Sequence, residues 1–269
     1  SVVRTFTIEV LGVNSPPTFT VGGPVAVDED SGPYTGPLAS NIDDGDLDEV
    51  QALEFIVQNN SNPALFASGP HVDADSGQLT FEPATDAFGT ASITLILRDD
   101  GGTENGGADT SAEATFEISI QGINDPPGFD LPAAAPAVLE DAGAQVVAGF
   151  ASNLVTGPAN ESDQTLTGFT VSLDSSDATL AFSAAPAIDV ATGTLTYTVA
   201  PGAYGSASLS ATLHDDGGNA NGGIASFSRS FSIQVTGIND APGFTSGGPV
   251  SVLEDSGAQD LPWASGIHD

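Results

Sequence analysis

The most constraining feature of this sequence is a six-residue motif that occurs three times. It is Gly12-Val13-Asn14-Ser15-Pro16-Pro17 in the first copy, Gly122-Ile123-Asn124-Asp125-Pro126-Pro127 in the second and Gly237-Ile238-Asn239-Asp240-Ala241-Pro242 in the third. Its asparagines are spaced 110 and then 115 residues apart. A self-similar period of this size indicates tandem domains rather than one large fold. We therefore expect the functional residues to lie at the joints between domains.

Other short patterns keep a fixed order around this repeated motif. Each copy is followed by an acidic pair, and the segments between copies share an Asp-Asp-Gly-Gly turn and an Asn-Gly-Gly turn. This order predicts the last strand of a preceding repeat (1–17), two whole repeats (18–127 and 128–242) and the start of another (243–269). We interpret the chain as a window on a longer polypeptide.

The segments between these landmarks alternate apolar and polar residues. Examples are Phe116, Ile118 and Ile120, with the same spacing at 6–10, 93–97, 209–213 and 231–235. Period-two alternation bounded by Gly, Pro, Asn and Asp is typical of β-strands, and no stretch has a helical stripe. Several short strands in about 110 residues fit an antiparallel sandwich of immunoglobulin-like type. The predicted fold is therefore all-β: tandem antiparallel β-sandwiches joined end to end.

The charge balance limits the partners of the chain. It has 36 acidic residues against three arginines and no lysine, which gives a formal net charge of −33. Nucleic acid and anionic membranes need Lys and Arg, so neither is an expected partner. Self-repulsion destabilises such a chain unless cations compensate. Two sources remain open: bound divalent cations, or a high-salt environment that screens repulsion. The lack of lysine suggests adaptation to salt as well as metal binding.

Catalysis and membrane insertion find little support. Cysteine is absent, so the chain has no disulfide or thiolate chemistry. No stretch approaches the roughly 18 consecutive apolar residues of a membrane span. No nucleophile elbow, phosphate loop or zinc motif is present, and we predict that the chain is not an enzyme.

The acidic residues instead suggest a metal site. Calcium needs six to eight oxygen ligands from carboxylates, amide groups and backbone carbonyls. The acidic positions fall at strand ends and turns, and most recur at homologous places, although an Asp-Asp-Gly-Gly sequence is also a plain turn and surface acids also serve solubility. The predicted metal ligands are Glu29, Asp48, Glu49, Asp99, Asp100, Asn124, Asp125, Glu140, Asn160, Glu161, Asp215, Asp216, Asn239, Asp240 and Glu254.

These motifs resemble those of cadherin domains, and more closely the cadherin-like repeats of large bacterial surface proteins and adhesins. The segment 124–127 resembles the cadherin linker, and 99–101 and 215–217 resemble the Asp-x-Gly turn late in a cadherin domain. The glutamates of the acidic pairs resemble the early cadherin glutamate, and 48–49 and 160–161 occupy the region of its Asp-x-Asp ligands. The resemblance covers essentially the whole chain and implies Greek-key sandwiches with calcium at the joints.

The sequence also departs from the cadherin pattern. Gln121 and Thr236 replace the acid expected before the linker, and the glutamate expected after the middle strand is only arguably Glu82, with Thr198 in the second repeat. Asn14-Ser15 lacks the linker aspartate. We therefore expect fewer ions per joint than in a cadherin, and weaker binding at Asn14-Ser15 than at Asn239-Asp240.

The leading hypothesis for function is a non-catalytic extender. In it, calcium-rigidified repeats form the stalk of a large extracellular or surface-anchored prokaryotic protein, with the neighbouring repeats of the same chain as partners. The alternative is a binding module that recognises cell-surface or matrix glycans, other proteins or like chains, including a filament or sheath subunit. That alternative predicts an exposed aromatic cluster or an unpaired edge strand.

Overall fold

The computed structural model describes residues 3–47 and 50–268, with His268 as backbone only. Its contacts divide the chain into two compact units. The first unit runs up to Asp125 and takes in two later segments, Gly157–Gln164 and Gly217–Ala225. The second unit consists of Pro126–Thr156, Thr165–Asp216 and the chain from Ser226 onward. Two loops of the predicted second repeat thus belong to the first compact unit.

The first unit is a sandwich of two main sheets. One sheet has the strand order β2-β9-β8-β5, with β2 parallel to β9 and the other pairs antiparallel, and the other sheet has the order β3-β7-β6. A short ladder pairs β1 with β4. The strands are β1 (Thr18–Val21), β2 (Val25–Asp28), β3 (Tyr34–Pro37), β4 (Ala39–Asp43), β5 (Glu54–Asn60), β6 (Phe66–Val72), β7 (Gln78–Pro83), β8 (Gly89–Arg98) and β9 (Ala114–Gln121).

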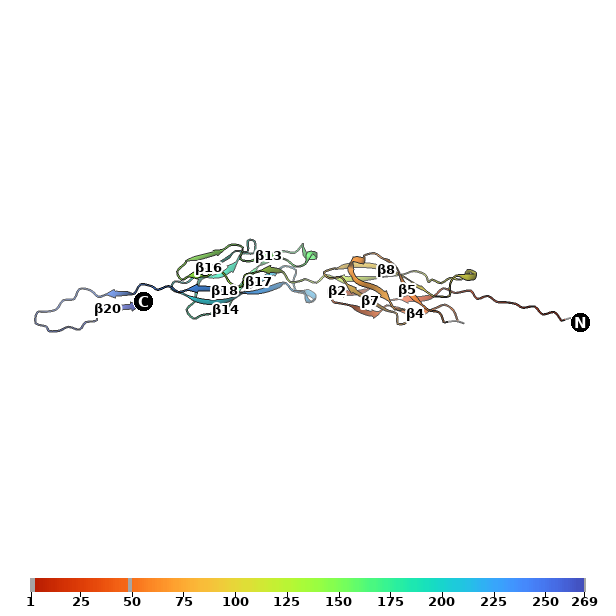
Figure 1. Ribbon diagram of the computed structural model, residues 1–269, viewed down its shortest axis with the longest axis horizontal. Helices are drawn as coiled ribbons and strands as arrows, with labels where there is room; N and C mark the ends of the chain where they lie inside the picture. Colours follow the sequence, from red (N-terminus) through yellow and green to blue (C-terminus); the bar gives the residue numbers. More distant parts are fainter. Residues whose placement is uncertain (1–2, 48–49, 269) are drawn as a thin grey trace. The chain divides into compact units, whose positions relative to one another are not determined.

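The second unit repeats this topology. Its main sheets have the orders β11-β18-β17-β14 and β12-β16-β15, and β10 pairs with β13. Figure 1 shows β14, β17 and β18 running beside one another in this unit. The strands are β10 (Gly128–Asp130), β11 (Val138–Leu139), β12 (Ala144–Val147), β13 (Ser152–Val155), β14 (Leu166–Ser176), β15 (Phe182–Ile188), β16 (Leu195–Val199), β17 (Gly205–Asp215), β18 (Ser226–Thr236), β19 (Gly243–Ser246) and β20 (Ala264–His268), the last two paired with each other.

The only helical segments in the described residues are four short 3₁₀ turns. They are η1 (Pro63–Leu65), η2 (Glu104–Gly106), η3 (Ala159–Glu161) and η4 (Ala220–Gly222). The predicted all-β class is therefore confirmed. Within the same residues, no helix combines the length and the apolar character needed to cross a membrane.

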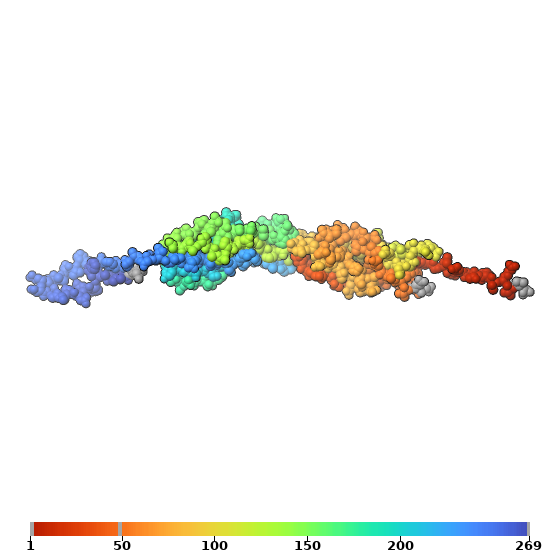
Figure 2. Space-filling model, viewed as in Figure 1, coloured from red at the N-terminus to blue at the C-terminus, as the bar shows by residue number. Residues whose placement is uncertain are grey.

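Each unit has its own apolar core, built from the alternating residues of its strands. Ile93, Leu95 and Leu97 of β8 are fully buried. Leu209, Ala211 and Leu213 of β17 are at most 1% exposed. The predicted inward faces of β9 and β18 are buried as well. Burial of such side chains is the main stabilising contribution to folding. Figure 2 shows segments of the second unit, 126–156 in green and 226–236 in blue, packed together in space.

The turns use left-handed backbone at homologous places. Asp30 and Asp141, the second residues of two acidic pairs, have φ of 56° and 61°, and Asn105 and Asn221 of the Asn-Gly-Gly turns have φ of 56° and 55°. Asn and Asp tolerate this conformation better than other residues with a side chain. The polar residues of these turns therefore have a backbone role, whatever else they do.

The segment 3–17 has no strand assignment, and Phe6, Ile8 and Val10 are exposed. We predict these residues to be a strand of a preceding repeat, and such a strand would need the rest of that repeat as its partner. That prediction, like the repeat boundaries, remains a prediction.

The core gives a first testable prediction. Replacing Leu95, which is fully buried, by alanine removes apolar contacts and leaves a cavity, and should lower the free energy of unfolding of the first unit by about 2–5 kcal/mol. The measurement is native-state hydrogen exchange of the amides of β5, β8 and β9. Ser92→Ala, on the exposed side of the same strand, is the control and should change protection little. Equal effects of the two substitutions would contradict the assigned strand faces.

Candidate metal-binding site

The first half of the repeated motif contacts turns and loops that precede it. The backbone N–H of Ile123 donates a hydrogen bond to Oε1 of Glu29 at 2.7 Å. Gly122 lies against the ring of Phe88, so that a Cβ at this position would be 3.2 Å from the ring. The third copy has homologous contacts: Ile238 donates to the Glu140 carboxylate, and Gly237 lies against Tyr204. A larger residue at this position would force the aromatic ring to shift by a few tenths of an ångström, so the close contact favours glycine.

The asparagine of the motif contacts a loop that follows it. Asn124 donates its side-chain N–H to the carbonyl of Ile224 at 2.9 Å, and the Ile224 N–H donates back to the Asn124 carbonyl at 2.8 Å. Asn14 and Ala108 form the same pair, at 2.8 and 3.0 Å. We call this two-bond pairing the asparagine latch. Both examples lie inside the first compact unit.

Glycines and a glutamine surround the latch in both copies. A Cβ on Gly101 would lie 2.2 Å from Oδ1 of Asn14, and one on Gly217 would lie 1.6 Å from Oδ1 of Asn124. Only glycine fits beside the latch, which explains the Asp-Asp-Gly turns. Gln51 donates to Asn14 Oδ1 at 2.8 Å and to Asp46 Oδ2 at 3.0 Å. Sequence reasoning missed this glutamine, although Gln51-Ala52-Leu53 recurs as Gln164-Thr165-Leu166.

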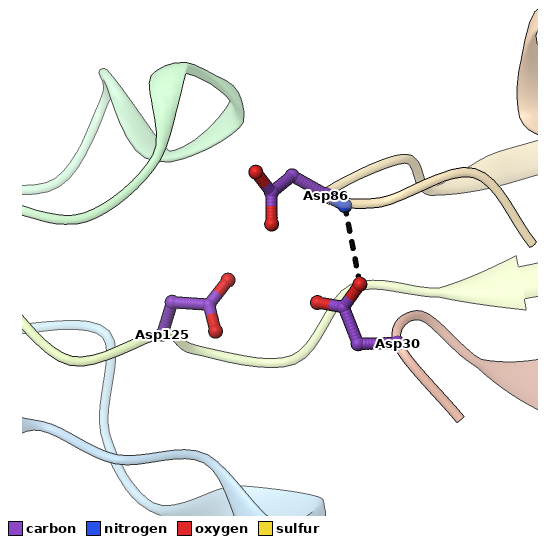
Figure 3. A group of neighbouring side chains, drawn as sticks. All are labelled: Asp30, Asp86 and Asp125. Atoms are coloured by element: carbon purple, nitrogen blue, oxygen red, sulfur yellow. Dashed lines mark hydrogen bonds between the residues drawn. The ribbon is translucent and has the colours of Figure 1, made fainter. Parts of the chain in front are cut away.

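Three carboxylates form the closest acidic group in the described residues. Oxygen atoms of Asp30, Asp86 and Asp125 all lie within 4.8 Å of one another, and Figure 3 shows the three side chains around a common space, with the Asp86 backbone N–H donating to Asp30 at 3.3 Å. Such a group could hold a metal ion. Sequence reasoning missed Asp86, because the homologous residue of the second repeat is Gly202 and the acid does not recur.

Further oxygen atoms lie near Asp125 and Glu29 or line a neighbouring cavity. Glu161 is 4% exposed, and its Oε1 accepts a hydrogen bond from the Asp125 N–H at 2.8 Å. Asn160 donates to Oε2 of Glu29 at 3.2 Å. Oδ2 of Asp125, Oδ1 of Asn160 and Oε1 of Gln164 are buried and accept no hydrogen bond. A cavity of about 200 Å³ is lined by Asn160, Glu161 and Gln164 together with residues of the repeated motif.

The electrostatics of this site are unfavourable without a cation. Burial raises the pKa of Glu29, and the neighbouring charges of Asp30, Asp125 and Glu161 raise it further. Burial also raises the pKa of Asp125, with contributions from Asp30 and Asp86. The two ion pairs seen in the described residues lie elsewhere, between Arg98 and Glu54 and between Arg229 and Asp130. Carboxylates with raised pKa values and no cationic partner favour binding of a cation.

A second group of oxygen atoms lies at the other latch. Asp99 is 5% exposed, and its Oδ1 accepts hydrogen bonds from the Asn14 side chain at 2.8 Å and from the Gly101 N–H at 3.0 Å. Its Oδ2 and Oε1 of Gln51 are buried and accept no hydrogen bond. Gln51 and Asp46 help to line a cavity of about 380 Å³. This group is a weaker candidate because its linker has Ser15 in place of an aspartate.

The structure thus brings together five of the predicted ligands, Glu29, Asn124, Asp125, Asn160 and Glu161, and places Asp99 in the second group. Asp100 and Asp216 instead accept hydrogen bonds from the backbone N–H groups of Ala52 and Thr165, at 2.8 and 2.7 Å, which indicates a structural role. Among the other predicted ligands, Glu140 and Asp215 are buried, and Asn239, Asp240 and Glu254 are exposed. Asp48 and Glu49 are outside the described residues, so the structure does not place them.

Comparison with known proteins gives a structural likeness only. No known family model and no curated protein matches the sequence. Among solved structures, mouse cadherin-23 EC22-24 is similar at 18% identity and a TM-score of 0.45, over 87% of this chain and 71% of that one. Drosophila N-cadherin EC1-3 is similar at 17% identity and a TM-score of 0.30, over 84% of this chain and 69% of that one. Protocadherin gamma B2 domains 3-6 are similar at 16% identity and a TM-score of 0.42, over 85% of this chain and 54% of that one. These TM-scores are below 0.5 and assign neither a family nor an activity.

The asparagine latch can be tested by one substitution. Asn124→Ala removes the donor to Ile224 while leaving the backbone bond in place, and should cost about 1 kcal/mol of local stability. We expect the Ile224 amide to exchange with solvent several-fold faster, measured by hydrogen exchange. The control is Asn239→Ala, because that side chain donates only to the carbonyl of the adjacent Asp240 among the described residues. Unchanged exchange at Ile224 would contradict the latch.

The raised pKa values predict an unusual pH dependence for metal-free protein. The folded state binds protons at Glu29 and Asp125 at a higher pH than the unfolded state, whose values are near the ordinary 4.5 and 3.8. The free energy of unfolding of the first unit should therefore rise as the pH falls from 7 toward these ordinary values. Asp73, Asp189 and Asp216, whose pKa values are lowered, have the opposite effect only at lower pH.

The measurement is urea unfolding of calcium-depleted protein at several pH values between 7 and 5. Backbone amides of the first unit serve as the probes of unfolding. Asp125→Asn, which removes one of the two titrating groups and relieves the other, should flatten the dependence. A wild-type unfolding free energy that falls steadily over this pH range would contradict the electrostatic account.

Proposed function

We propose that this chain is a non-catalytic structural module whose repeats are stiffened by calcium. The observation that carries the proposal is the group around Asp125, where three carboxylates lie together near buried amide and carboxylate oxygens. Among the described residues, no cationic side chain forms an ion pair with this group. Oxygen-only sites of this kind suit calcium, which accepts six to eight such ligands at irregular angles. Zinc and copper would prefer nitrogen or sulfur ligands.

The residues present fit a bound calcium ion. Asp30, Asp86 and Asp125 would supply carboxylate oxygens, and Asn160 and Gln164 have buried side-chain oxygens that accept no hydrogen bond. The ion would offset the like charges that raise the pKa values of Glu29 and Asp125. It would also tie loop 157–164 to the strands and turns that carry Asp30 and Asp86. Because the ion would bind the arrangement in which these residues are in place more tightly than a loosened one, it would stabilise that arrangement.

The mechanism of stiffening follows from where the residues lie in the sequence. The repeated motif joins the predicted repeats 18–127 and 128–242, and its second copy contributes Asp125 to the site. A cation that holds this residue would restrict rotation of the chain at the linker, while the prolines that follow limit the backbone. We therefore assign the module to the stalk of an extracellular or surface protein. We also propose that this protein is prokaryotic.

The binding-module alternative has less support. Phe88 and Tyr204 are about half exposed, but each is explained by its contact with a glycine of the repeated motif. They therefore form parts of the structure rather than a free aromatic platform.

The deciding experiment is calcium titration of the full chain by calorimetry, combined with small-angle scattering. Wild-type protein should bind calcium and become less flexible, and chelation should reverse the change. Asp86→Gly, which installs the residue found at the homologous position of the second repeat, should weaken the tightest site about tenfold or more through loss of one carboxylate. Asp75→Gly, in an exposed turn, is the matched control and should bind as the wild type does. Absence of binding at millimolar calcium would overturn the proposal.

A further inference from the structure

The second unit has a surface that differs from the rest of this acidic chain. The outward side chains of β17 are Ser206, Ser208, Ser210, Thr212 and His214, which alternate with the buried residues of the core. β18 presents serines at every second position from Ser226 to Ser232. β14 adds Thr170, Ser172 and Ser175. We call the outward surface of these three strands the hydroxyl face; Figure 1 shows the strands within their unit.

Register aligns the hydroxyls of this face in rows across the sheet. One row is Ser172, Ser210 and Ser230, and a second is Thr170, Thr212 and Ser228. A third row is Ser175, Ser208 and Ser232. Neighbouring strands lie about 4.8 Å apart, and successive rows are about 7 Å apart along a strand. The result is a regular field of groups that both donate and accept hydrogen bonds.

The hydroxyl face carries little charge. Among the described outward residues of β14, β17 and β18, Asp174 is the one carboxylate, and it accepts a hydrogen bond from Ser210 at 2.6 Å. A second carboxylate, Asp177, lies at the end of the face just after β14 and accepts a hydrogen bond from the Ser206 hydroxyl at 3.0 Å. The homologous face of the first unit is different, with Glu54, Arg98 and Glu117 among its outward residues. In a chain with a net charge of −33, a nearly neutral face of this extent needs an explanation beyond solubility.

We propose that the hydroxyl face is the docking surface for a second copy of this chain. A hydroxyl is both donor and acceptor, so a field of hydroxyls is complementary to its own copy, whereas a field of carboxylates is not. Two copies of an acidic chain repel each other wherever carboxylates face carboxylates. The hydroxyl face allows contact without that penalty. The geometry suits an isologous contact, in which the same patch is used by both copies.

A neutral glycan is a less suitable occupant. Sugar rings are usually held by aromatic side chains in a concave site together with a few polar groups. The described outward residues of the three strands include no aromatic side chain except the imidazole of His214, which contacts Thr170 at 3.1 Å. An open sheet of small side chains fits another sheet better than it fits a sugar.

The size of the face sets the expected strength of the contact. Three strands of 11 residues cover roughly 36 Å by 14 Å. Two copies would bury about 1,000 Å² in total, near the lower limit for a specific interface. The contact should therefore be weak between free chains. It gains strength where many repeats are held side by side, because tethering raises the effective concentration.

Sedimentation equilibrium of the full chain tests the proposal, in calcium and again in chelator. We expect a reversible dimer that strengthens as NaCl rises from 0.05 to 1 M, because salt screens the repulsion between the two chains. Ser208→Glu with Ser230→Glu should weaken the dimer about tenfold or more through like-charge contact. The matched control is Thr90→Glu with Thr115→Glu, which adds the same charge on the homologous face of the first unit and should leave the dimer within about twofold of the variant-free chain.

Several results would overturn the proposal. One is a wild-type chain that stays monomeric at millimolar concentration in 1 M NaCl. Another is equal weakening by both charge variants, which would place the contact elsewhere. Retention on a neutral polysaccharide without self-association would favour a glycan. If the Ser208 and Ser230 variant fails to fold, hydrogen exchange of dilute and concentrated wild type replaces it, and concentration-dependent protection must then map to β14, β17 and β18.

Discussion

The structure depends on how it accommodates buried carboxylates in a chain with three arginines and no lysine. Glu29, Asp99, Glu140, Glu161 and Asp215 are all less than 10% exposed. Buried carboxylates are normally paired with cationic side chains or hydrogen-bonded to several donors. Here backbone N–H groups and side-chain amides donate hydrogen bonds to some of these carboxylates, as the Ile123 N–H does to Glu29. The oxygens that remain without donors are concentrated near the repeated motif, which is why that region is the candidate for a bound cation.

The repeated motif has two functional halves. Gly122 and Ile123 fix the motif to the turns and loops before it, and Asn124 fixes it to the loop after it through direct hydrogen bonds. The latch requires no metal. A cation at Asp125 would therefore act on a linker that is already positioned by amide groups, and its main effect would be on charge repulsion and flexibility rather than on the path of the backbone.

Much of the fold could be predicted from the sequence because its signals are periodic. The inward residues of β8, β9, β17 and β18 follow from alternation alone, and the turns follow from Gly, Asn and Asp. The site was less predictable, because homology between the repeats was the main guide to it. Asp86 does not recur in the second repeat, and Gln51 and Gln164 recur but carry no charge. Asp100 and Asp216 recur because they accept hydrogen bonds from backbone N–H groups. A pattern of acidic residues cannot distinguish this role from that of a metal ligand.

The division of the repeated motif between Ile123 and Asn124 has a consequence for how such arrays change in length. Each half carries its own contacts, and the third copy keeps the first-half contacts at Gly237 and Ile238 just as the first copy keeps the latch at Asn14. Recombination at this point would exchange whole repeats while every new junction regains both sets of hydrogen bonds.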